Sequence, residues 1–280
     1  MKTIPSNYRL FFPLIGIILL ITSCSFGDND LETAGENENG ETLFQQAFSN
    51  GLLANEAFVR SRYLMKDWLD YVDPRTGLLP RNLFDSRDIW NPQDSAADNY
   101  PFFVITSYFT DPDLYLNQMQ EILLTETALT SRIDHLPDQY SFPKGDFVDE
   151  DSDLERIMFG SAEYVKDGLL TIVELLGATP WRARMIGILD DMWRQAKVET
   201  PSGTIVSTNH EVNGEMLQIL SRVYWMTGDE QYLEYAIRLG DYYLLGKNHP
   251  TRNFKELRLS DHGSEIVSGL TELYATRASL

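Results

Sequence analysis

Apolar residues recur at helical spacing along most of this chain, and no other feature constrains its fold as strongly. From Met216 to Met226 the apolar positions follow the period of one buried helical face. Similar segments are separated by turns rich in Gly, Pro and Asp, and strand-like alternation is almost absent. The sequence therefore predicts helices over residues 41–71, 94–109, 111–129, 154–176, 180–196, 209–227, 229–245 and 261–280.

Short turns between these helices define their packing. Helices joined in this way stack as antiparallel hairpins. Pairs that recur at roughly forty residues are typical of a solenoid or of a closed ring of hairpins. The predicted fold class is therefore all-α, built from antiparallel helical hairpins. The polar connection from Ser131 to Asp153 interrupts the pattern, and loops of that length are usually functional or mobile.

The first residues have the pattern of an export signal. Lys2 and Arg9 precede an apolar run over residues 10–21 that is too short for a permanent bilayer anchor. Thr22 and Ser23 separate this run from Cys24, the single cysteine of the chain. This stretch resembles a bacterial lipoprotein signal, in which the cysteine is lipidated after cleavage before it. We expect a signal peptide over 1–23, a flexible acidic tether over 24–40 and a folded domain over 41–280, anchored to the membrane of the bacterial cell envelope through Cys24.

The charge of the chain limits its partners. The formal net charge is −19, and loss of Lys2 and Arg9 with the signal peptide takes it to −21. Such a surface repels nucleic acid, so we expect no nucleic-acid partner. An acidic ligand is compatible with this charge only where Arg or Lys gather at a pocket. With the single cysteine lipidated there is no disulfide, so the core depends on packing.

Three polar clusters lie at the start of predicted helices, at residues 94–100, 209–215 and 261–265. Each combines acids with amides or imidazoles. If alternate helices point the same way, these ends gather at one rim. Carboxyl groups removed from water there would have separated pKa values and act as general acid and base. Ordinary helix capping is the alternative for each cluster, since acids favour helix N-termini.

The candidate catalytic acids come from these clusters and from one helix interior. Glu215 lies four residues after Glu211 on the same helical face, where like charges repel. Asp167 follows Lys166 between apolar positions, as either a buried structural pair or a pocket acid. We predict that the catalytic residues are drawn from Asp98, Asp167, Glu215 and Asp261.

The candidate substrate-binding residues are polar or aromatic side chains of the same segments. Aromatic rings can stack on sugar faces, although at helical spacing they are more often part of the core. Trp90 is the strongest aromatic candidate because it lies in a predicted loop. The predicted set is Trp90, Asn99, Tyr100, His210, Glu211, Asn213 and His262.

Four segments together resemble a known family. Residues 90–100, 163–168, 209–215 and 261–265 are similar to the α/α-toroid (six-hairpin) glycosidases of polysaccharide-degrading bacteria, and within them to lipoproteins that act on uronic-acid glycans. The resemblance implies a helical ring with the active site at one mouth and a pair of Asp or Glu acids acting on a glycosidic bond. A full ring has about twelve helices and this chain yields about eight, so we expect an incomplete toroid or part of a longer protein.

These observations predict a glycoside hydrolase whose substrate is a uronic-acid-containing polysaccharide or oligosaccharide. One alternative is a polysaccharide lyase on the same fold, with His210 or Tyr100 as base. Another is a non-catalytic glycan-binding or scaffold lipoprotein. We expect no cofactor, since the chain lacks a glycine-rich phosphate loop. We also expect no metal, because His210 and Glu211 are adjacent and no histidine pair has the spacing of a zinc helix.

Overall fold

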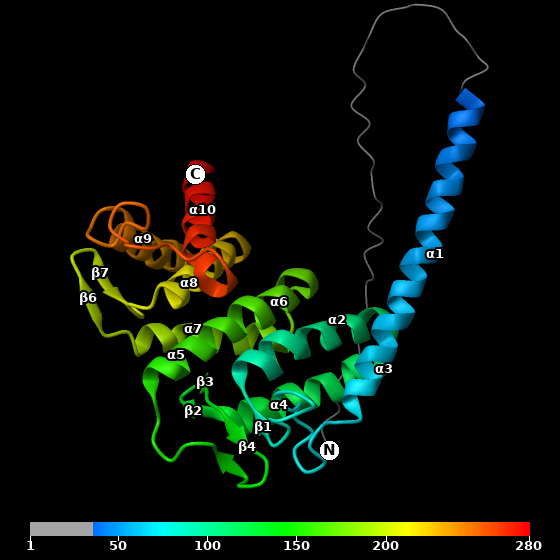
Figure 1. The fold of residues 1–280 in the computed structure, drawn as a ribbon, viewed down its shortest axis with the longest axis horizontal. Coiled ribbons are helices and arrows are strands. Elements are labelled where there is room, and N and C mark those ends of the chain that lie inside the picture. The colour runs from blue at the N-terminus through cyan, green and yellow to red at the C-terminus, as the bar shows by residue number, and fades with distance from the viewer. Residues whose placement is uncertain (1–35) are drawn as a thin grey trace, which may run out of the picture. The chain divides into compact units, whose positions relative to one another are not determined.

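The computed structural model describes residues 36–280, except for the side chains of residues 36–39, Asp261 and His262. Helices dominate it, which confirms the all-α class. The ribbon in Figure 1 labels them: α1 (Glu36–Leu69), α2 (Tyr100–Thr110), α3 (Pro112–Leu116), α4 (Gln118–Thr130), α5 (Leu154–Glu163), α6 (Leu170–Leu176), α7 (Pro180–Arg194), α8 (His210–Thr227), α9 (Glu230–Leu244) and α10 (Glu265–Ala278). Every predicted helical range overlaps at least one of these helices.

The chain divides into two compact units, Met1–Gly51 and Leu52–Leu280, and α1 crosses this division. Helix α1 begins at Glu36, so the last residues of the predicted tether are helical. Within the second unit only the end of α1 enters the core: Met65 is fully buried, whereas Leu52 and Tyr63 are exposed. The predicted amphipathic helix is therefore present, but most of its apolar residues lie outside the core.

Two predicted helices contain π-helical segments, which hold one more residue per hydrogen-bonded turn than an α-helix. The segment η1 (Pro92–Asn99) precedes α2, and η2 (Tyr164–Leu169) connects α5 to α6. Segments of this kind are rare and occur often at functional sites. The two segments pack against each other and against α5. At Gly160 of α5 an added Cβ would lie 2.5 Å from Cγ of Pro92, so glycine permits this close approach.

Short strands occupy the long connections. Strands β1 (Ile89–Trp90), β4 (Tyr140–Ser141) and β5 (Asp146–Phe147) form an antiparallel sheet in the order β1-β4-β5. Strand β2 (Ser131–Ile133) pairs with β3 (Leu136–Pro137), and β6 (Val198–Thr200) pairs with β7 (Gly203–Ile205). The predicted loop over residues 131–153 is therefore ordered by β-pairing, and β1-β4 pairing fixes it beside the start of η1.

A buried ion pair stabilises the middle of the second unit. The guanidinium of Arg184 on α7 donates to both carboxylate oxygens of Glu126 on α4, at 2.6 and 3.1 Å. Both side chains are almost fully buried. A buried charge without a partner is strongly destabilising, so each residue requires the other.

The last three helices form a closely packed group. Helix α8 packs against both α9 and α10, as their adjacent ribbons in Figure 1 show. At Gly214 of α8 an added Cβ would lie 2.3 Å from the carbonyl carbon of Glu265, so this crossing requires glycine. Across residues 36–280, no helix has both the length and the apolar character needed to cross a bilayer.

Candidate functional site

A cavity of about 300 Å³ opens between η1, α5 and η2. This volume is at the lower end of the range for small-molecule sites. Eight of its ten lining residues have polar side chains, namely four carboxyl groups, three amides and one guanidinium. The lining residues are Arg81, Asn91, Gln93, Asp94, Ala97, Asp98, Gln139, Phe159, Glu163 and Asp167.

The local fold explains why these side chains meet. Asn91 caps η1 by accepting a hydrogen bond from the backbone N–H of Ser95, so that the segment starts beside the cavity. Asp94 and Asp98, four residues apart, are both on η1. Glu163 is the last residue of α5, and Asp167 follows it four residues later on η2. Contact between η1 and η2 then brings the four carboxyl groups to the same cavity.

Two of these carboxylates have cationic partners. Nε of Arg81 lies 3.0 Å from Oδ2 of Asp94. Nζ of Lys166 lies 3.0 Å from Oδ1 of Asp167 and 2.9 Å from Oε1 of Glu265, the first residue of α10. These pairs reduce the net negative charge of the wall, and the lysine connects α10 to the cavity.

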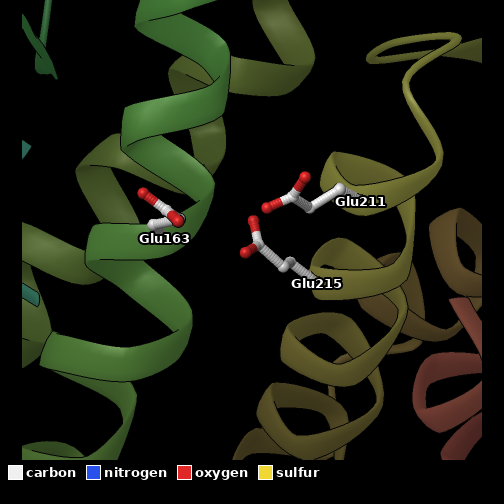
Figure 2. Close-up of side chains that lie close together, drawn as sticks. All are labelled: Glu163, Glu211 and Glu215. Carbon is white, nitrogen blue, oxygen red and sulfur yellow. The ribbon is translucent and has the colours of Figure 1, made fainter. Parts of the chain in front are cut away.

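Behind the cavity wall three glutamates from two helices face one another. Figure 2 shows Glu163 of α5 pointing toward Glu211 and Glu215 of α8. One carboxylate oxygen from each residue lies within 4.8 Å of the other two. Glu163 is 5 % exposed and Glu215 is 0 % exposed. This set, the Glu163–Glu211–Glu215 cluster, adjoins the cavity through Glu163, which lines both.

Burial changes the protonation of this cluster. It raises the pKa of Glu163 to about 8, with further contributions from the nearby carboxylates of Glu211, Asp167, Asp98 and Asp94. Burial also raises the pKa of Glu215 to about 10, and the neighbouring Glu163 adds to this. Both glutamates therefore hold a proton at neutral pH, unlike ordinary surface carboxyl groups.

The structure brings together most of the predicted acids. Asp98 and Asp167 line the cavity, and Glu215 lies behind it beside Glu163. Glu211, a predicted substrate-binding residue, belongs to the same cluster. Acids from residues 94–100 and from residues 209–215 therefore both lie near Glu163.

Trp90 and Tyr100 instead belong to the core. Trp90 is 2 % exposed and packs edge-to-face against Tyr164, with ring centroids 6.4 Å apart. Tyr100 is 3 % exposed, and its hydroxyl accepts a hydrogen bond of 2.9 Å from Nε1 of Trp181. Neither ring presents a face to a sugar, so the stacking role predicted for them does not fit this structure.

Three further candidates mainly hold the backbone and the packing. Nδ2 of Asn99 donates to the carbonyl of Asp94, and Nδ2 of Asn213 donates to the carbonyl of Ser207. His210 stacks on Phe254 with centroids 4.3 Å apart, and burial lowers the pKa of its imidazole. These three residues are not among those that line the cavity. The side chains of Asp261 and His262, together with Cys24, lie outside the described residues.

Glu163 was not among the predicted catalytic or substrate-binding residues. It lies in the segment 163–168, but inside a predicted helix rather than at its start. Glu163 and Asp167 are four residues apart and so lie on one helical face. This spacing is the sequence signal from which Glu163 could have been predicted as a site residue. Arg81 and Gln139 come from loops, for which helical spacing gives no information.

Comparison of the chain with protein-family models, with curated proteins and with solved structures gives no match.

Proposed function

We propose that this protein is a glycoside hydrolase that cleaves a polysaccharide or oligosaccharide by acid–base catalysis with paired carboxyl groups. One observation carries the proposal: Asp98, Glu163 and Asp167 line the same cavity as the amides of Gln93 and Gln139. Glycoside hydrolysis requires two carboxyl groups on opposite sides of the scissile bond. Amide groups are suited to hydrogen-bonding sugar hydroxyls, since they donate and accept.

The environments of the three acids suggest their roles. Glu163 is 5 % exposed, whereas the side chain of Asp167 is 37 % exposed and Asp98 is exposed. A carboxyl group shielded from water retains its proton and serves as general acid. We assign Glu163 as the proton donor to the leaving oxygen, and either Asp98 or Asp167 as the base or nucleophile. Glu215 supports Glu163 from behind rather than touching substrate.

The charge of the wall is compatible with an acidic sugar. Arg81 neutralises Asp94, and Lys166 neutralises Asp167. Arg81 is the single cationic residue among those that line the cavity, so it is the proposed contact for a uronate carboxylate. The uronic-acid class of substrate therefore remains part of the proposal, with Arg81 as the residue on which it depends.

The proposal extends to architecture and location. Hairpins with short turns, such as α6–α7 and α8–α9, are the units from which an α/α toroid is built, and they support an incomplete ring. Anchoring to the cell envelope through a lipid on Cys24 rests on the sequence pattern alone.

The environment of Tyr100 and His210 favours hydrolysis over the lyase alternative. A lyase needs a base beside the sugar ring, and these were its candidates. Tyr100 is buried and hydrogen-bonded in the core, and burial raises the pKa of its hydroxyl. Nδ1 of His210 lies 2.9 Å from the hydroxyl of Tyr243, away from the residues that line the cavity.

The test is to incubate the purified full chain with acidic and neutral glycans, and to follow reducing ends together with the ultraviolet band of unsaturated uronates. Hydrolysis predicts new reducing ends without that band. If both rise, the protein is a lyase. If a glycan binds without any product, the protein is a glycan-binding lipoprotein and the proposal is wrong.

A further inference from the structure

The Glu163–Glu211–Glu215 cluster has a feature that acid–base catalysis does not use. Glu215 is completely buried, and neither of its carboxylate oxygens has a hydrogen-bond partner among residues 36–280. Figure 2 shows this side chain directed toward Glu163 and Glu211. Buried polar groups are nearly always hydrogen-bonded, because burying one without a partner is costly. The buried oxygens therefore point to a ligand.

The chemistry of the cluster identifies the class of that ligand. Three carboxylates offer only oxygen atoms, which are the ligands of hard divalent cations. We propose that Glu163, Glu211 and Glu215 bind one divalent cation, Ca²⁺ in preference to Mg²⁺. The cation would compensate the repulsion between three close carboxylates and give both oxygens of Glu215 a partner.

The burial of the cluster favours Ca²⁺ over Mg²⁺. Mg²⁺ gives up its water ligands reluctantly and is seldom held by protein oxygens alone, whereas Ca²⁺ is commonly bound by several carboxylates. Glu215 is completely buried and Glu163 nearly so, which leaves little room for the water that Mg²⁺ retains. The three oxygens lie within 4.8 Å of one another, close enough for one cation to contact all three.

The cavity provides the path for the cation. Glu163 lines the cavity and is the member of the cluster through which a cation would enter from it. Ca²⁺ takes about six to eight oxygen ligands, more than three monodentate carboxylates supply. Water or sugar hydroxyls entering through the cavity would complete the coordination.

The cation site goes beyond the proposed hydrolysis, and the two would use Glu163 in different protonation states. A cation binds the ionised carboxylate and displaces its proton, so proton and cation are alternative occupants. Glu163 faces Glu211, Asp167, Asp98 and Asp94, and Glu215 faces Glu163, Lys166, Asp167 and Glu211. The single cation in this set, Lys166, is already paired with Asp167 and Glu265.

Sequence patterns did not predict this site. Metal motifs are usually recognised from histidine or cysteine spacing, or from a dense acidic loop. Here two ligands lie four residues apart on α8, and the third comes from α5, about fifty residues earlier.

The test is calorimetric titration of the chelator-treated full chain with CaCl₂ and with MgCl₂. We expect one Ca²⁺ per chain, bound at least tenfold more tightly than Mg²⁺. Glu211→Gln and Glu215→Gln should each weaken Ca²⁺ binding at least tenfold. Glu155→Gln, which changes an exposed glutamate on α5, should leave it unchanged.

The proposed site is wrong if the wild type shows no saturable Ca²⁺ binding. It is also wrong if Glu211→Gln and Glu215→Gln both bind Ca²⁺ as tightly as the wild type. Equal affinity for Mg²⁺ would overturn the preference for Ca²⁺. If Glu215→Gln does not fold by circular dichroism, Glu211→Gln decides, because its side chain is less buried. These readouts require no turnover, so failure of the proposed hydrolysis would leave this test intact.

Discussion

Replacing Glu215 by glutamine should change how the stability of the fold depends on pH. Burial raises the pKa of Glu215 from an ordinary 4.5 to about 10, so the folded protein retains a proton that the unfolded chain releases. Where the folded state binds more protons, the free energy of unfolding falls as pH rises. The stability associated with the protonated group is complete below pH 4.5 and is lost progressively up to about pH 10. Glutamine has no proton to release and avoids this loss.

The size of the effect follows from linkage. Each pH unit between the unfolded and folded pKa values costs the wild type about 1.4 kcal/mol through this group. Between pH 6 and pH 8 the variant should gain about 2.7 kcal/mol relative to the wild type. For a chain of this size that corresponds to a relative rise in Tm of roughly 5–11 °C.

The assay is thermal unfolding of wild type, Glu215→Gln and Glu155→Gln at pH 6, 7 and 8, with a chelator present so that no cation competes. The difference in Tm between Glu215→Gln and wild type should increase steadily with pH, whereas Glu155→Gln should follow the wild type. A constant difference between Glu215→Gln and wild type would refute the reasoning, because Glu215 would then be ionised in the folded protein.

Four further substitutions test the packing of the chain by urea unfolding. Glu126→Gln should cost about 3–5 kcal/mol, because it leaves the buried guanidinium of Arg184 without its carboxylate; a cost below about 1 kcal/mol would mean that water reaches the pair. Trp90→Ala should cost about 3–5 kcal/mol as a core truncation, whereas weaker glycan binding with full stability would restore its predicted stacking role. Gly160→Ala should cost about 1–3 kcal/mol, since its Cβ meets Pro92. Gly51→Ala, with no neighbouring atom within 4 Å among the described residues, should instead stabilise α1 by about 0.5–1 kcal/mol.

Helical periodicity predicted the elements of this fold well because local spacing determines them. The ranges 180–196 and 209–227 correspond closely to α7 and α8. Pro180 is the first residue of α7, and Gly228 caps the C-terminus of α8. The π-helical segments were not predicted, because their extra residue per turn depends on the packing of η1 against η2. The β-pairing of residues 131–147 was also missed, since each strand has only two or three residues.

The candidate site was predictable in part for the same reason. Polar residues at helix starts identified Asp98, Glu211 and Glu215, and a polar pair inside a helix identified Asp167. The approach of Glu163 to Glu211 and Glu215 required the tertiary contact between α5 and α8, which no spacing along the chain encodes. Trp90 looked like an exposed loop residue, but pairing of β1 with β4 buries it.

The central claim, that the carboxyl groups of this cavity hydrolyse a glycosidic bond, is tested most directly by turnover of Glu163→Gln. The measurement is the rate of reducing-end release from the best glycan substrate, with wild type and Glu155→Gln in parallel. Loss of a general acid predicts a rate about 10²–10⁴-fold lower for Glu163→Gln and an unchanged rate for Glu155→Gln. A Glu163→Gln variant that turns over at the wild-type rate would contradict the account.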